Sequence, residues 1–303
     1  MYDIIIIGAG PAGLTAAIYA RRASKSVLVL EALSYGGQII NTPDIENYPA
    51  VPHVSGFVFA TKVYEQAQEL GAEFVYEKAV GIRDNGGTKT VVTTENEYEG
   101  KAVIIATGSE NRKLGLPNEA DLVGRGVSYC ATCDGAFYRK KVVAVVGGGN
   151  TALEDALYLA DLAETVYVIH RRDAFRGDES TVSALKQRDN VKFVYNSTIT
   201  KLNADKRLTS IEVTDKDGGV STLEVNGLFV AVGRIPENQN FAEIIKLDDA
   251  GYVAAGEDCI TNAPGIFAAG DNRTKSVRQL VTAAADGAVA ATEAVRYISS
   301  LTA

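Results

Sequence analysis

The segment IIIIGAGPAG at residues 4–13 decides the fold that this sequence predicts. Four consecutive isoleucines favour a strand that is buried on both faces, as in a parallel sheet. The glycine-rich turn Gly8–Gly13 follows, residues 14 to about 23 continue as a helix, and a second apolar strand over residues 27–31 ends in Glu31. Strand, turn, helix and strand together form the βαβ unit that holds a dinucleotide, with its pyrophosphate at the helix N-terminus.

Glu31 strengthens this interpretation, because it lies 23 residues after Gly8 at the end of the second strand. A carboxylate at that place accepts hydrogen bonds from a ribose 2′-hydroxyl. An isolated G-x-G-x-x-G is a weak signal, since ordinary turns also match it, but here the strand, the helix and the acid are all present. The candidate cofactor residues of this unit are Gly8, Gly10, Pro11, Ala12, Gly13 and Glu31.

Residues 142–170 repeat the same plan of apolar strand, glycine turn, helix and strand, with the turn GGGNTA at residues 147–152. Shifting the first unit by 139 positions superposes the two turns and places His170 where the first unit has Glu31. The register holds over some thirty residues, so one supersecondary unit is used twice. We therefore predict an α/β fold with two three-layer, Rossmann-like dinucleotide-binding domains.

The second unit differs from the first at the position that selects the nucleotide. His170-Arg171-Arg172, with Arg176 four residues further on, replaces the acid. Guanidinium groups bind a 2′-phosphate through paired, charge-assisted hydrogen bonds, whereas a carboxylate repels it. We expect a 2′-hydroxyl dinucleotide in unit one and NADPH in unit two; the alternative is a solvated basic face. The candidate residues are Gly147, Gly149, Asn150, Thr151, Ala152, His170, Arg171, Arg172 and Arg176.

The segment Cys130-Ala131-Thr132-Cys133-Asp134 lies between the two turns. Two thiols at this spacing can close and reopen a disulfide, and Asp134 can move the proton that such chemistry requires. Asp134 has an alternative interpretation as an ordinary turn or cap residue. Zinc needs four ligands, and Cys259, His53 and His170 form no second ligand pair, so we expect no metal. We interpret Cys259 as structural.

Composition excludes several other classes of protein. The chain has 303 residues, which suggests two domains, and a net charge of −8 argues against a nucleic-acid surface. No apolar run approaches the roughly 20 residues that span a bilayer. The N-terminus enters a strand at once, which leaves no room for a leader peptide. We therefore expect a soluble, cytoplasmic protein, and only three cysteines make a disulfide framework improbable.

Further segments carry local signals. Residues 55–70 read as a helix with Ser55 as its cap and Gly71 as its stop, and residues 277–301 as a long closing helix. Asn-Gly and Asp-Gly steps at residues 84–87 and 215–219 predict hairpins. Domain boundaries are expected near residues 113 and 240, where short two-stranded connections could lie.

Taken together, these residues resemble the low-molecular-weight, bacterial-type thioredoxin reductases, essentially from end to end. The resemblance implies a split FAD-binding domain, residues 1–112 and 240–303, with an NADPH-binding domain, residues 113–239, inserted and carrying the dithiol. The motifs that carry it are Gly8–Gly13, Gly36-Gly37-Gln38, Glu46-Asn47-Tyr48-Pro49, Ala106-Thr107-Gly108, Cys130–Gly135, Gly147–Ala152, His170–Arg176, Gly265–Asp271 and Arg278-Gln279.

By the same resemblance, Cys133 exchanges electrons with the flavin, Cys130 attacks the partner disulfide and Asp134 is the acid–base group. The partner is thioredoxin or a thioredoxin-like protein, and the enzyme is a homodimer. The segment after Asp134 departs from the family, because Ala136 replaces the first of two consecutive aromatics and only Phe137-Tyr138 follow. The further residues that the resemblance assigns to FAD are Gly36, Gly37, Gln38, Asn47, Thr107, Gly108, Asp271, Arg278 and Gln279.

Three rival functions remain open at this point. A relative that takes electrons from ferredoxin should lack the 2′-phosphate arginines Arg171, Arg172 and Arg176. A ferredoxin–NADP reductase of similar fold lacks the C-x-x-C. A flavoprotein sensor that uses the dithiol as a switch would bind the cofactors but would not turn over a protein disulfide.

Overall fold

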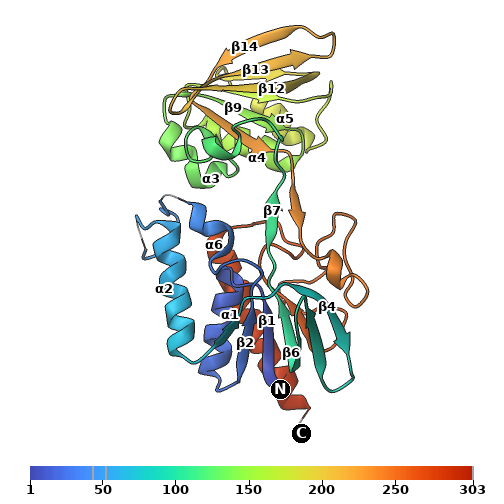
Figure 1. Cartoon of the computed structure of the whole chain (residues 1–303). Coiled ribbons are helices and arrows are strands. Elements are labelled where there is room, and N and C mark those ends of the chain that lie inside the picture. Colours follow the sequence, from blue (N-terminus) through green and yellow to red (C-terminus); the bar gives the residue numbers. More distant parts are fainter. Residues whose placement is uncertain (43, 52, 302–303) are drawn as a thin grey trace. The chain divides into compact units, whose positions relative to one another are not determined.

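The computed structural model describes residues 1–42, 44–51 and 53–301, and the chain divides into two compact units. Unit 1 combines Met1–Glu110 with the chain from Ile235 onward, and unit 2 is the continuous segment Asn111–Arg234. The chain leaves unit 1 through β7 (Ser109–Asn111) and returns through β16 (Arg234–Pro236), which pair as a two-stranded sheet (Figure 1).

Unit 1 is built on a sheet with the strand order β3-β2-β1-β6-β5-β4, to which β17 is added beside β6. The pairs among β3, β2, β1, β6 and β17 are parallel, whereas β4, β5 and the start of β6 form an antiparallel meander. The elements are β1 (Tyr2–Ile7), α1 (Pro11–Arg22), β2 (Val27–Leu30), η1 (Gly37–Asn41), α2 (Gly56–Glu69), β3 (Glu73–Val75), β4 (Ala79–Asp84), β5 (Lys89–Thr93), β6 (Glu97–Ile105), η4 (Gln239–Phe241), β17 (Ile266–Ala268) and α6 (Leu280–Ser300).

Alternation along β1 divides the apolar interior of unit 1 into two cores. Ile4 and Ile6 point toward α1 and α6, and Ile5 and Ile7 point to the opposite face, where the meander packs. All four are at most 4 % exposed, which is the burial on both faces that the isoleucine run predicts. Helices, parallel sheet and meander thus form three layers (Figure 1).

Unit 2 has the same three-layer plan. Its parallel sheet has the order β11-β10-β9-β15-β8, and its antiparallel sheet the order β12-β13-β14. Helices α3, α4 and α5 cover one face of the parallel sheet and the antiparallel sheet covers the other. The elements are η2 (Ala120–Leu122), β8 (Val127–Ser128), α3 (Ala131–Asp134), η3 (Gly135–Tyr138), β9 (Val142–Gly147), α4 (Asn150–Ala160), β10 (Thr165–Ile169), α5 (Glu179–Lys186), β11 (Val191–Val194), β12 (Ser197–Ala204), β13 (Leu208–Asp215), β14 (Val220–Glu224) and β15 (Gly227–Ala231).

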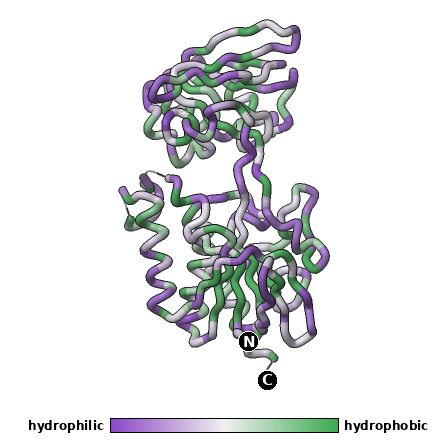
Figure 2. Tube along the Cα trace, in the orientation of Figure 1, coloured by the Kyte–Doolittle hydropathy of each residue, from purple (hydrophilic) through white to green (hydrophobic). Residues whose placement is uncertain are grey.

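The predicted fold class and the internal repeat are confirmed. Moving β1, α1 and β2 by 139 positions superposes them on β9, α4 and β10 to within one residue at each start. Both helices begin three residues earlier than expected, at Pro11 and Asn150, because the glycine turn itself supplies the first helical turn. Along the trace, the central strands of each unit are hydrophobic and the connections are hydrophilic (Figure 2).

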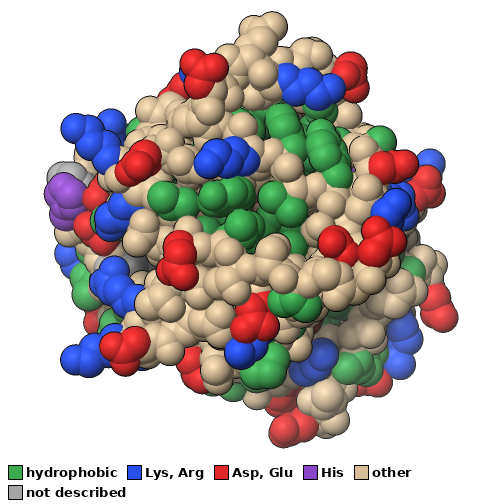
Figure 3. Space-filling model, turned by 90° about the horizontal axis from the view of Figure 1, so that it is seen from above, with side chains coloured by type: hydrophobic (Ala, Val, Ile, Leu, Met, Phe, Trp, Pro, Cys, Tyr) green, Lys and Arg blue, Asp and Glu red, His purple; other side chains and the backbone are tan. Residues whose placement is uncertain are grey.

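The capped helix, the two hairpins and the closing helix that the sequence predicts are also present. Ser55 caps α2 by accepting a hydrogen bond from the Val58 amide, and Gly71, with φ +89°, follows the helix end. The two hairpins join β4 to β5 and β13 to β14, and the closing helix is α6. Among the described helices, none combines the length and apolarity needed to cross a membrane. Apolar side chains gather in the middle of the face shown in Figure 3, and acidic and basic side chains lie mostly around them.

Candidate dinucleotide and dithiol sites

The glycine turn of unit 1 needs glycine at two positions and leaves space at a third. A Cβ atom at Gly8, where φ is +106°, would lie 2.4 Å from the Ala106 carbonyl oxygen, and one at Gly13 would lie 1.9 Å from the Gly8 carbonyl oxygen. Among the described residues, no atom lies within 4 Å of the Cβ position at Gly10, which is the N-cap of α1. No described side chain caps this helix, so no side chain competes with a pyrophosphate for its first amides.

Two other predicted segments meet this turn in unit 1. The Gly36 amide donates to the Ala9 carbonyl oxygen at 2.7 Å, and a Cβ atom at Gly37 would lie 3.3 Å from the Gly10 Cα. Gly270, which precedes Asp271, approaches the first turn of α1 at Ala12. These segments follow the carboxyl ends of parallel strands, where ligands bind in open α/β sheets.

Glu31 lies at the end of β2 with both carboxylate oxygens engaged. Oε2 accepts the Ala9 amide at 2.8 Å and Oε1 accepts the Leu33 amide at 3.0 Å. The carboxylate therefore fixes the turn and keeps lone pairs for a ribose hydroxyl. A small pocket opens beside it, lined in part by Gly8, Glu31, Lys78 and Thr107.

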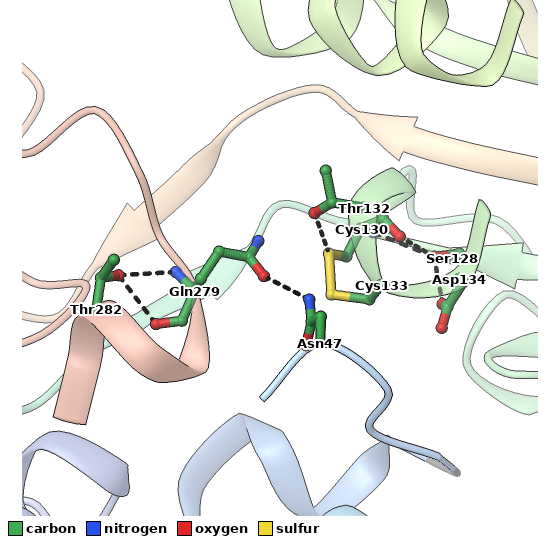
Figure 4. Close-up of a disulfide and its surroundings, with 8 residues drawn as sticks. All are labelled: Asn47, Ser128, Cys130, Thr132, Cys133, Asp134, Gln279 and Thr282. Carbon is green, nitrogen blue, oxygen red and sulfur yellow. Dashed lines mark hydrogen bonds between the residues drawn. A yellow bond between two sulfur atoms is a disulfide. The ribbon is translucent and has the colours of Figure 1, made fainter. Parts of the chain in front are cut away.

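The remaining unit 1 candidates have separate surroundings. Asn47 Nδ2 donates to Gln279 Oε1 at 3.1 Å, and Gln279 caps α6 in a capping box with Thr282 (Figure 4). The Arg278 guanidinium lies 4.2 Å from the centroid of the Tyr252 ring. Gln38 is exposed on η1, and Gly108 takes a left-handed φ of +70° after β6.

Asn238 is a buried residue beside the candidate site that the sequence did not reveal. It is fully buried, and its Oδ1 accepts the Thr107 hydroxyl at 3.2 Å. Its Nδ2 donates to the carbonyl oxygens of Gly251 and Asn272. Asn238 thus joins the end of β6 to the segment after β17, although Thr107 is 131 residues away in the chain.

The unit 2 turn repeats the geometry of the first. Gly149 is the N-cap of α4, none of the described side chains caps the helix, and nothing lies within 4 Å of its Cβ position. His170 lies beneath this turn, because a Cβ atom at Gly148 would be 2.1 Å from the imidazole Cε1. Burial lowers the pKa of His170, and the charges of Arg171 and Arg172 lower it further. The ring is therefore mainly neutral at pH 7 and supports the turn.

Three arginines lie at the surface beside this turn. Arg171, Arg172 and Arg176 are exposed, and within the described chain none of them has an ion-pair partner. The Arg176 amide donates to the Gly148 carbonyl oxygen at 2.7 Å, so the arginine segment folds back onto the turn. Asn150 also exchanges two hydrogen bonds with Asp178, the N-cap of α5. Thr151 is exposed and Ala152 is buried.

Cys130 and Cys133 form a disulfide with a Cα–Cα distance of 5.3 Å (Figure 4). Cys130 is the N-cap of the single-turn helix α3, which contains Cys133 and ends at Asp134. Both cysteines are partly exposed, and the Cys130 Sγ lies 3.4 Å from the Thr132 hydroxyl.

Asp134 is held beside the dithiol by Ser128. The Ser128 hydroxyl donates to Asp134 Oδ2 at 2.6 Å, and its oxygen accepts the Cys130 amide at 3.1 Å (Figure 4). Burial raises the pKa of Asp134 above its usual value, and the Ser128 hydrogen bond partly opposes that rise. A carboxyl with a raised pKa is suited to transfer protons near neutral pH.

Cys259 is structural, as the sequence suggested. It is fully buried, and its thiol donates to the Asp286 carbonyl oxygen at 3.6 Å. Burial raises its pKa to about 12, so the thiolate is inaccessible at physiological pH.

The family model of the pyridine nucleotide-disulphide oxidoreductases matches residues 2–287. The chain therefore belongs to the pyridine nucleotide-disulphide oxidoreductase family, and within it to the thioredoxin reductases. It is 43 % identical to a thioredoxin reductase of Listeria innocua, over 99 % of this chain and 95 % of that protein. The thioredoxin reductase of Bacillus subtilis is 40 % identical, over 99 % and 96 %. The crystal structure of a thioredoxin reductase from Streptococcus pyogenes superposes with a TM-score of 0.92 at 41 % identity, over 99 % of both chains.

Proposed function

We propose that this oxidoreductase uses NADPH and FAD to reduce the Cys130–Cys133 disulfide, and that the resulting dithiol reduces thioredoxin. The observation that carries the proposal lies within unit 2. The disulfide shares one compact unit with a dinucleotide turn flanked by three exposed arginines. A redox-active dithiol and a binding site for a phosphorylated reductant are therefore parts of the same folded body.

FAD fits unit 1. Its pyrophosphate suits the glycine turn, because the backbone approaches closely at Gly8 and Gly13, space is open above Gly10 and no described side chain caps α1. Glu31 suits its adenosine ribose. We assign Asp271, Arg278, Gln279 and Asn47 to the rest of the cofactor. When bound, the flavin supplies two-electron chemistry between a nicotinamide and a disulfide.

NADPH fits unit 2. The open space above Gly149 and the uncapped α4 suit the pyrophosphate, as in unit 1. In unit 2, His170 takes the place of Glu31, and Arg171 and Arg172 follow it, with Arg176 on the same loop. Guanidinium groups select a 2′-phosphate, so this site favours NADPH over NADH.

Two electrons and two protons convert the disulfide to two thiols, and Asp134 supplies or accepts a proton at the sulfur. The Cys130 thiolate then attacks one sulfur of the partner disulfide, which releases one partner thiolate and forms a mixed disulfide. Cys133 attacks Cys130 in this mixed disulfide, re-forms the Cys130–Cys133 bond and releases the second partner thiolate.

The partner, assembly and location belong to the same proposal. Thioredoxin is the substrate that the names of the relatives print, and we carry it over to this chain on 40–43 % identity along nearly its whole length. We further propose a homodimer in the cytoplasm, where a reducing thiol pool suits a dithiol that must be re-reduced in every turnover.

The test is NADPH-driven reduction of thioredoxin by the wild type, Cys130→Ser and Cys133→Ser, each saturated with FAD. We expect turnover by the wild type and none by either variant, with equal flavin content in all three. Thioredoxin reduction by both variants would refute the dithiol assignment. Turnover with reduced ferredoxin but not with NADPH would favour the ferredoxin-linked alternative.

A further inference from the structure

A buried ionic cluster in unit 1 consists of Arg273, Lys275 and Asp286. The Arg273 and Lys275 side chains are 0 % and 4 % exposed, and that of Asp286 is 6 % exposed. Arg273 Nε and Nη2 donate to the two Asp286 oxygens, both at 2.8 Å, and Lys275 Nζ donates to Oδ2 at 2.8 Å. One carboxylate on α6 therefore holds two cations of the segment that follows β17.

The same carboxylate reaches the backbone at the cofactor site. The Gly270 amide donates to Asp286 Oδ2 at 2.9 Å, and Gly270, with φ +89°, approaches Ala12 so closely that a Cβ atom there would lie 2.9 Å from the Ala12 Cβ. A Cβ atom at Gly287, next to Asp286, would lie 2.2 Å from the Ala12 carbonyl oxygen. Helices α1 and α6 lie side by side at this place (Figure 1).

The cluster has no direct part in the proposed redox chemistry, and ion pairing alone does not explain it. Removing two cations and an anion from water costs several kcal/mol per ion, so a buried pair is weak evidence for stability. The cluster sets the position of the segment after β17, because Gly270, Arg273 and Lys275 all bind the Asp286 carboxylate of α6. Asp271 and Arg278, the proposed flavin contacts, lie on this fixed segment, and Arg278 Nη2 also donates to the Arg273 carbonyl oxygen at 3.4 Å.

We propose that Asp286 is a positioning residue for the flavin: it holds the Gly270–Gln279 segment against the first turn of α1 and so pre-forms the binding site. This inference rests on the proposal that unit 1 binds FAD. Pre-forming the segment lowers the ordering cost of binding, so the effect should appear as flavin affinity.

The experiment measures the dissociation constant of FAD for deflavinated wild type and Asp286→Asn, by the quenching of flavin fluorescence. The asparagine keeps the shape but loses the charge, and it leaves two buried cations without a carboxylate. We expect affinity to fall roughly tenfold or more, with NADPH affinity unchanged. Glu257→Gln is the matched control, because Glu257 also contacts Arg273, at 3.3 Å, but is 90 % exposed; it should change FAD affinity less than about twofold.

A second variant covers the case in which Asp286→Asn fails to fold, as judged by far-ultraviolet circular dichroism. Lys275→Met keeps the Arg273–Asp286 pair and removes one donor to Oδ2; it should weaken FAD binding several-fold. A folded Asp286→Asn protein that binds FAD as the wild type does would overturn the inference, and so would wild-type affinity in Lys275→Met. If the deflavinated wild type itself takes up no FAD, the proposed function is what fails.

Discussion

The Ser128 hydroxyl lies 2.6 Å from Asp134 Oδ2, and the Ser128 hydroxyl oxygen also accepts the Cys130 amide at 3.1 Å. One serine at the end of β8 thus joins the candidate acid to the first cysteine of the disulfide. Its proton is shared between two acceptors, since the Cys130 carbonyl oxygen lies 3.3 Å away, and the shorter contact favours the carboxylate.

Ser128→Ala should raise the pKa of Asp134 further. Burial already raises it, and the Ser128 hydrogen bond is the interaction that opposes the rise. The pH dependence of NADPH-driven disulfide reduction should therefore shift to higher pH. Ser197→Ala is the control, because Ser197 is also buried in unit 2 but donates to the Tyr195 carbonyl oxygen. Equal shifts in both variants would contradict the assignment.

Asp134→Asn should slow dithiol turnover by roughly 10²- to 10⁴-fold, the usual loss when a general acid–base group is removed. The amide can still accept the Ser128 hydroxyl, so the disulfide geometry should persist. Stopped-flow reduction by excess NADPH, followed by thioredoxin addition, would locate the slow step. Turnover at the wild-type rate would show that Asp134 is only a helix-end residue.

Arg171→Gln and Arg176→Gln should raise the KM for NADPH roughly tenfold each and leave the KM for NADH nearly unchanged, because a charge-assisted hydrogen bond to the 2′-phosphate is lost. Arg188→Gln provides the control, since Arg188 is an exposed arginine of unit 2 that pairs with Asp161. If NADH and NADPH suffer equally, the arginines form only a solvated basic face.

Asp155→Asn should stabilise the protein above pH 7. Burial, with a smaller contribution from the charge of Glu154, raises the pKa of Asp155 from 3.8 to about 7. The folded state therefore binds a proton that the unfolded state has lost, and stability falls as pH rises from about 4 to about 7. After allowance for partial exposure, we expect a gain of about 1–3 kcal/mol at pH 8 that disappears toward pH 4. Urea unfolding at both pH values measures it, with Glu154→Gln as a control of small effect.

The two βαβ units could be predicted because their signals are local. A strand, a glycine turn and a helix lie within about thirty residues, and the isoleucine run shows burial on both faces of the sheet. The strand, the turn and the cap at Ser55 can therefore be predicted from the sequence alone. The sequence pattern predicts helix starts three residues after Pro11 and Asn150, because the last three residues of each turn motif read as turn although they form the first turn of the helix.

The supporting residues could not be predicted, because their partners are distant in the chain. Asn238 meets Thr107 across 131 positions, and Asp286 meets Arg273 and Gly270 across 13 and 16. None of these three spacings corresponds to a helical or strand period. Ser128 is close to Asp134 in sequence, but a serine two residues before a cysteine has no signature of its own. Such contacts are set by how strands stack in space.

The discontinuity of unit 1 has a consequence for how the chain matures on the ribosome. Segment Asn111–Arg234 is continuous, so all of its strands have been synthesised before β17 and α6 emerge. Unit 1, by contrast, lacks β17, which pairs with β6, and α6, which packs against α1, until the last part of the chain is made, although β1 and β5 can pair with β6 earlier. The part of α1 that packs against α6 therefore stays uncovered throughout synthesis of the intervening 124 residues from Asn111 to Arg234. Nascent chains should therefore need protection from aggregation longest at their N-terminal end.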